Sequence, residues 1–205
     1  MKALAVVLLA LVWAAPASAA RHHHHRAPVV WPALPVEPWP HWGNDAIGDC
    51  AFAAAADWEL MTRGSVHASE AQLIQEFHEA GGSDTQGLQP DAFGAYWLAH
   101  GIAGVHARLV THAPSEVQAL LRAHTPVIAE MQLTAGETLE PMPFRAGKAL
   151  IIEGPITIAA TTAHYALVAG VNTTGPQIVS WGIGLQLTWA QWNATALSTF
   201  LPIGA

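Results

Sequence analysis

Hydrophobic positions divide the chain into a first part with helical spacing and a second part with strand-like spacing. Apolar residues fill nearly every position from Ala51 to Met61, which is typical of a buried helix that follows a turn-forming run. That helix is expected to end near Arg63. Further helices are expected over about Ser69–Ala80, Pro90–His100 and Ser115–Ala123. In the last of these segments, Ser115 and Gln118 have the spacing of a capping box.

The second part of the chain contains short apolar runs bounded by turn residues, as strands do. Two of these runs are separated by Asn172–Gly175 and predict an antiparallel pair. The predicted strands are Thr125–Leu133, His164–Val171, Gln177–Trp181, Leu187–Trp192 and Thr199–Ile203. Helices followed by strands, rather than alternating with them, indicate an α+β fold with an antiparallel sheet.

The first 19 residues have the pattern of an export signal. Lys2 precedes the apolar run Ala3–Ala14, and Pro16–Ala19 provides small residues for cleavage. A retained membrane helix is the alternative, but the run is shorter than the roughly 20 residues that a span needs. We therefore expect a secreted or periplasmic protein with no stable membrane insertion after cleavage.

Residues 20–41 form a proline- and tryptophan-rich arm, which we expect to lie across the surface of the domain formed by residues 42–205. Its tryptophans, including Trp39, are too apolar to be left in water. The arm also contains His22–His25, which suggests metal capture or, as the simpler interpretation, a basic stub or affinity tag. A metal site of defined geometry needs spaced ligands on a rigid frame, so none is expected here.

Composition narrows the class of function. The chain has 52% hydrophobic and 11% charged residues, which describes a compact protein with a substantial core. Its formal net charge is −7, and its eight Lys and Arg residues are scattered, so nucleic-acid binding is not expected. The sequence does not indicate an oligomeric state.

Cys50 is the only cysteine of the chain, and it stands where a loop meets a helix. Backbone N–H groups at a helix N-terminus stabilise a thiolate, which favours a nucleophile. A lone cysteine cannot form an internal disulfide, so the alternative is an inert side chain. We expect an ionised thiol at this position.

Several segments, taken in order, resemble papain-like cysteine peptidases. Gly48–Ala54 resembles the nucleophile turn and its helix, Ala163–Val171 resembles the histidine strand, and Val179–Gly182 is similar to Asn-Ser-Trp-Gly. The likeness extends over about residues 40–192. It is greatest to bacterial and phage proteins with Gly-Asn-Asp-x-x-Gly-Asp-Cys, and C39-type peptidases are also similar. The resemblance implies a papain-like fold.

The resemblance also implies acyl-transfer chemistry. Cys50 would attack a carbonyl carbon, and His164 would accept and return the proton. Asn44, six residues before Cys50, stands where the family carries its oxyanion-hole glutamine. Val179 replaces the asparagine that orients the histidine, and valine cannot accept a hydrogen bond. We therefore expect Ser180 to take that role.

Three further residues are assigned to the cleft. Trp181 matches the tryptophan that shields the histidine, with a simple core role as the alternative. Asp49 would either oppose ionisation of the neighbouring thiol or cap the helix. Ala163 precedes His164 and would line the cleft.

The sequence supports an exported thiol hydrolase that cleaves peptide or isopeptide bonds through a thioester, with no cofactor. Its partner would be a peptide or protein substrate. An inactive papain-like module that binds peptides and a metal-binding protein that uses the His tract are the alternatives.

Overall fold

The computed structural model describes residues 39–44, 46–88, 90–141 and 155–203. Its helices are α1 (Cys50–Arg63), α2 (Glu70–Glu79), α3 (Pro90–His100), α4 (Pro114–Arg122) and α5 (Trp189–Thr195). The predicted export signal, His22–His25 and residues 142–154 lie outside the described residues.

Local sequence explains where several helices begin and end. Ser69 caps α2 with a complete capping box to Gln72, and Thr188 caps α5 in the same way. Helix α1 ends at Arg63 and is capped by Gly64, whose φ of 77° lies in the left-handed region that glycine adopts readily. The bounds of α1 and α3 agree with the sequence prediction.

Eight strands of the described chain form one antiparallel sheet in the order β1-β8-β2-β5-β6-β7-β3-β4. The strands are β1 (His106–Val110), β2 (Val127–Leu133), β3 (Thr138–Pro141), β4 (Ile156–Thr157), β5 (Thr162–Val171), β6 (Pro176–Ser180), β7 (Ile183–Gln186) and β8 (Ala196–Ile203). Five helices with this antiparallel sheet confirm the α+β class.

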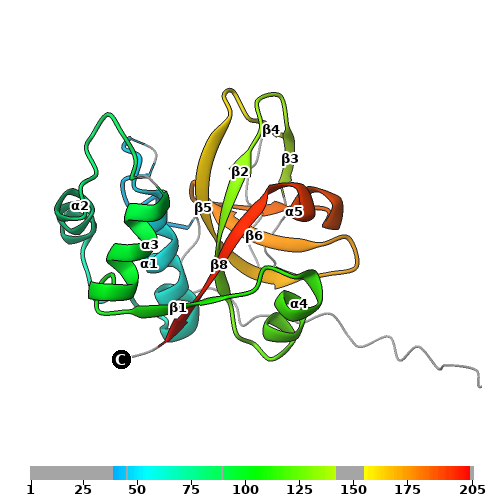
Figure 1. Cartoon of the computed structure of the whole chain (residues 1–205), viewed down its shortest axis with the longest axis horizontal. Coiled ribbons are helices and arrows are strands. Elements are labelled where there is room, and N and C mark those ends of the chain that lie inside the picture. Colours follow the sequence, from blue (N-terminus) through cyan, green and yellow to red (C-terminus); the bar gives the residue numbers. More distant parts are fainter. Residues whose placement is uncertain (1–38, 45, 89, 142–154, 204–205) are drawn as a thin grey trace, which may run out of the picture.

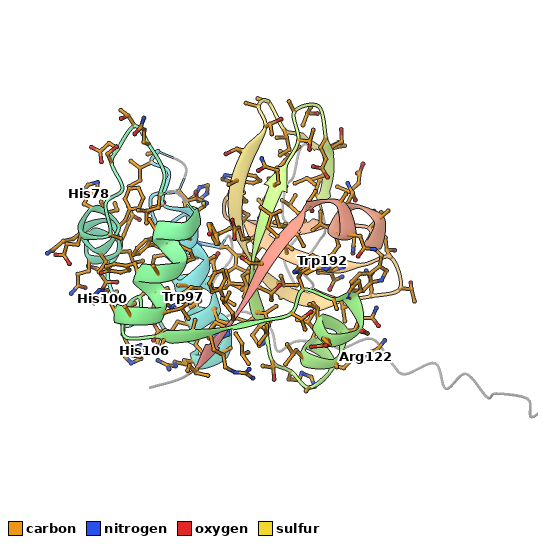
Figure 2. All side chains as sticks on the ribbon, viewed as in Figure 1. His78, Trp97, His100, His106, Arg122 and Trp192 are labelled. Carbon is orange, nitrogen blue, oxygen red and sulfur yellow. The ribbon has the colours of Figure 1, made fainter. Side chains whose placement is uncertain are left out.

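The sheet separates two apolar clusters. Helices α1, α2 and α3 gather on one side of it, and α4 and α5 lie on the other (Figure 1). Trp97 of α3 belongs to the first cluster and Trp192 of α5 to the second (Figure 2). Side chains alternate along β5, so Tyr165 and Leu167 face the first cluster whereas Ala166 faces the second.

Helix α1 is buried on all sides, as its apolar composition predicts. Every residue from Ala51 to Met61 is buried. Trp39, the one arm tryptophan among the described residues, is 1% exposed in the first cluster, as expected for that arm. This packing fixes the helix that carries Cys50 against β5 and β6.

Two local predictions are wrong. Ser115 does not cap α4, because the helix begins one residue earlier at Pro114 and Ala113 is the N-cap. Leu187–Trp192 is not a strand. The capping box from Thr188 to Gln191 starts α5 there, and the strand lies earlier, at β7. The short strands β1, β3 and β4 were not predicted.

The described ranges contain the helices α1 to α5. None of the helices there combines the length and the apolar character that crossing a bilayer requires.

Candidate active site

Cys50 is the first residue of α1 and is partly buried. Asp49 precedes it as the N-cap, and the Asp49 carbonyl accepts hydrogen bonds from the N–H groups of Phe52 and Ala53 at 2.8 and 3.1 Å. The Asp49 side chain is buried and makes no capping hydrogen bond. The alternative in which this carboxyl caps the helix is therefore wrong.

The expectation of an ionised thiol is also wrong for this conformation. Burial raises the pKa of Cys50 to about 11, although hydrogen bonds from backbone groups, including that of Tyr165, act to lower it. The negative charge of Asp49 raises it further. The helix N-terminus does not compensate for this loss of solvent, so the resting thiol is neutral at pH 7.

His164 lies near the start of β5 and is 4% exposed. Its Nε2 is 2.5 Å from the hydroxyl oxygen of Ser180 on β6. The hydrogen bond expected in place of the missing asparagine is therefore present. Burial lowers the pKa of His164 to about 3, so the imidazole is neutral at pH 7.

Trp181 covers the imidazole of His164. The two rings are stacked with centroids 4.2 Å apart and planes 18° apart, which confirms the predicted contact. Trp181 and Gly182 form the two-residue turn between β6 and β7, with φ values of 49° and 71°. Positive φ at both positions characterises type I′ hairpin turns, where Trp is an unusual first residue. Trp181 thus sits in a strained position that places its indole on the histidine.

A cleft of about 280 Å³ brings most of the predicted site residues together. Its lining includes Cys50 and Ala51 from α1, His164 from β5, and the turn that holds Asn44. The complete lining is Asn44, Ile47, Gly48, Cys50, Ala51, Phe77, Gly87, Leu88, Thr162, Ala163, His164, Tyr165 and Trp181. Asp49 is not among these residues, so its assignment to the cleft wall is wrong.

A second, smaller pocket lies behind Cys50. It is lined by Cys50, Asn44, Ser180 and Trp181, together with Asp57 and His41. Asp57 is 3% exposed, and its Oδ1 accepts a hydrogen bond of 2.9 Å from the indole N–H of Trp42. Burial raises the pKa of Asp57 to about 8 despite this bond.

Sequence reasoning missed Asp57. The available signal was a carboxylate directly after the alanine run of α1, seven residues after Cys50 and therefore on the same helix face. Val179 is buried and lines the same pocket, where it packs without the hydrogen bond that an asparagine would make.

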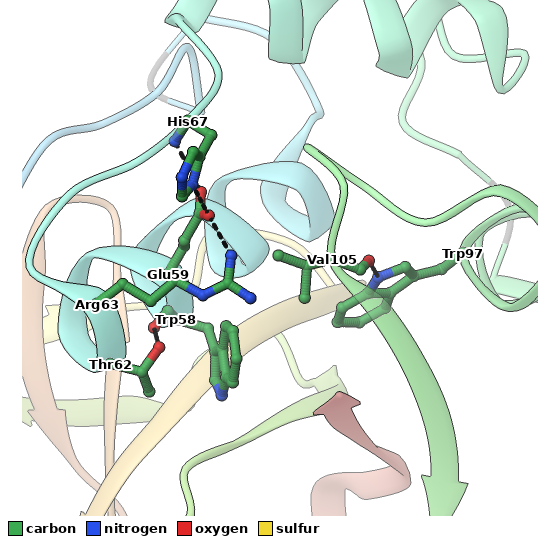
Figure 3. Close-up of polar contacts among 7 residues, drawn as sticks. All are labelled: Trp58, Glu59, Thr62, Arg63, His67, Trp97 and Val105. Carbon is green, nitrogen blue, oxygen red and sulfur yellow. Dashed lines mark hydrogen bonds and ion pairs between the residues drawn. The ribbon is translucent and has the colours of Figure 1, made fainter. Parts of the chain in front are cut away.

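Glu59, a second buried carboxylate of α1, belongs to a different environment. Its side chain contacts Arg63 at 2.8 Å, the backbone N–H of His67 at 2.9 Å, and the His67 ring (Figure 3). These contacts fasten the loop after α1 to the helix. Glu59 lines neither pocket and has a structural role.

Metal binding finds no support within the described ranges. No group of three or more His, Cys, Asp or Glu side chains there is placed to hold an ion. The His tract lies outside those ranges.

Comparison with known proteins does not identify the chain. No family model matches it, and no curated protein matches it significantly. The assignment of function therefore depends on the geometry of the site.

Proposed function

We propose that this protein is an exported thiol hydrolase of papain-like type that cleaves peptide or isopeptide bonds. The observation that carries the proposal is that the only cysteine shares a cleft with His164, which is bonded to Ser180 and covered by Trp181. A buried histidine with a hydrogen-bonded partner and a helix-start thiol in the same cleft are the groups that nucleophilic acyl transfer requires.

The first step forms a thioester. In the tautomer that this step requires, His164 Nε2–H donates to Ser180, which leaves the lone pair of Nδ1 to take the thiol proton as sulfur bonds to the carbonyl carbon. The carbonyl electrons move to oxygen, where the Cys50 N–H and the Asn44 amide stabilise the charge. The C–N bond then breaks, and the leaving amine takes the proton from His164.

The second step hydrolyses the thioester. Water attacks the same carbonyl carbon and gives its proton to His164. The C–S bond breaks, the sulfur recovers the proton, and the carboxylic acid leaves. Since thiol and imidazole begin neutral, proton transfer accompanies attack instead of preceding it.

Cleavage of a mixture of quenched fluorescent peptides tests this proposal. The mature protein should release fluorescence, and Cys50→Ala should not. A time course of the wild type that matches Cys50→Ala, across a peptide mixture of varied sequence, would contradict hydrolase activity.

An inactive peptide-binding module is the second candidate, and the raised pKa of Cys50 favours it. A neutral thiol beside the buried carboxylate of Asp49 is a poor nucleophile. This candidate predicts that immobilised wild type and Cys50→Ala retain the same peptides equally, and that mass spectrometry finds every retained peptide intact. Cleaved peptides eluting from the wild type alone would exclude it.

A further inference from the structure

Two turns of the same sequence type flank the pocket behind Cys50. In the first, Trp42 and Gly43 have φ values of 55° and 94°, and the Asn44 N–H donates to the His41 carbonyl at 2.9 Å. The second is the Trp181 turn between β6 and β7. Each therefore places a tryptophan in the left-handed region, which residues other than glycine rarely adopt.

The two turns pack against each other. A Cβ built on Gly182 would lie 2.7 Å from His41 Nε2 and 2.8 Å from the Trp39 carbonyl oxygen, so only glycine fits. Each tryptophan side chain also contacts one element of the site. The Trp181 indole stacks on His164, and the Trp42 indole donates to Asp57 of α1.

Asn44 depends on the first of these turns. It lies directly after Trp42 and Gly43, lines both pockets, and would supply one of the two oxyanion donors. The Trp42–Asp57 hydrogen bond is a side-chain tie between this turn and the helix that begins with Cys50. A displacement of about 1 Å at a reacting group can reduce a rate by about 100-fold, so such a tie has consequences for catalysis.

We propose that Asp57 is a positioning residue that acts through Trp42 to hold Asn44 at the cleft. This inference rests on the proposed hydrolase function and deepens it. Asp57 itself does not contact the reacting atoms. Its spacing of seven residues from Cys50 corresponds to about 10 Å along the helix axis.

Ionisation of Asp57 adds a pH-dependent effect. Its raised pKa of about 8 keeps the carboxyl neutral at pH 7, and at higher pH a buried negative charge opposes charge development on sulfur and oxyanion. The other titratable groups of this pocket are Cys50 from α1, His41 from the preceding segment and Tyr165 from β5. The β6–β7 turn contributes none.

Acetyl transfer from 4-nitrophenyl acetate to Cys50 provides the test, measured by nitrophenol release and by intact mass. Asp57→Ala and Trp42→Phe should each slow transfer by about 10- to 100-fold, and the double variant should be no slower. In an Asn44→Ala background, itself about 100-fold slower, Asp57→Ala should have no further effect. Alkylation by iodoacetamide needs no oxyanion donor and should change by less than about 3-fold at pH 7.

Asp57→Asn separates positioning from folding. Its amide oxygen still accepts the Trp42 N–H, so the rate at pH 7 should recover, and at pH 9 the variant should exceed the wild type. The same pH difference should persist in a His41→Gln background, which excludes His41 as its source. Trp58→Phe is the matched control, because it removes an indole hydrogen bond of α1, to the Pro126 carbonyl, outside the pocket.

The outcomes distinguish the two proposals. Failure of the wild type to take an acetyl group would overturn the hydrolase function and this inference with it. A wild type that is acetylated while Asp57→Ala and Trp42→Phe react within about 2-fold of it would overturn the role of Asp57 alone. Losses that add in the double variant would show that Asp57 does not act through Trp42.

Discussion

The ring centroids of Trp181 and His164 lie 4.2 Å apart, with the two ring planes 18° apart. With Ser180 bonded to Nε2, the ring is held by one polar contact and one apolar contact. This enclosure removes solvent from the imidazole and explains why the pKa of His164 falls to about 3. Burial of the His164 imidazole beneath Trp181 is therefore linked to its neutral charge state.

Replacing Trp181 should restore protonation of His164. Trp181→Ala exposes the imidazole, so its pKa should rise toward the ordinary value of about 6.5, whereas Trp181→Phe should raise it less. NMR titration of the His164 ring protons measures this directly. Identical titration in the wild type and both variants would reduce Trp181 to a packing residue.

Ser180→Ala should weaken activity without abolishing it. The hydroxyl that holds Nε2 is lost, so the ring orientation is less defined and a buried N–H loses its partner, at about 1 to 3 kcal/mol. We expect transfer to fall by about 3- to 10-fold, against a much larger loss in His164→Ala. Equal rates in Ser180→Ala and wild type would remove Ser180 from the site.

Asp57→Asn should stabilise the protein at neutral and alkaline pH. The folded-state pKa of about 8 exceeds the unfolded value of 3.8, so the folded state retains the proton and stability falls as pH rises between these values. The variant lacks this loss, which amounts to about a few kcal/mol. Urea unfolding at pH 5 and pH 9 should show a smaller difference in Asp57→Asn. An unchanged difference would mean that Asp57 is ionised throughout.

Gly182→Ala should force the two tryptophan turns apart. The new Cβ would meet His41 and the Trp39 carbonyl, so we expect a loss of about 2 kcal/mol or more together with slower acetyl transfer. Gly136→Ala is a matched control, because its φ of 83° is similar but no atom lies within 4 Å of the added Cβ. It should lose only about 1 kcal/mol, from backbone strain. Equal losses in the two variants would contradict the steric explanation.

Local patterns predicted those parts of the fold that local forces determine. Helix α1 followed from its apolar run and from Gly64, and β5 and β6 followed from the turn residues between them. Leu187–Trp192 was misassigned because its apolar residues suit a strand, whereas the capping box at Thr188 starts a helix there. Strand β1 has mostly exposed positions and lies at a sheet edge, so its sequence carries little periodic signal.

The site was predictable by residue type but not by charge state. Cys50, His164 and Ser180 were identified from their order and their neighbours. The ionisation of Cys50 was not, because a helix N-terminus is visible in sequence whereas burial of the thiol is visible only after folding. Asp57 was missed for the same reason, since its partner Trp42 comes from a separate loop.

The proposed acyl transfer requires Cys50 and His164 to act together, and the rate at which Cys50 takes an acetyl group from 4-nitrophenyl acetate at pH 7 tests this most directly. Because Cys50 is the only cysteine, intact mass assigns the modification, with Cys50→Ala as the blank. We predict that the wild type is acetylated about 100-fold or more faster than His164→Ala, as expected for loss of a general base. Equal rates in these two proteins would contradict the proposed dyad.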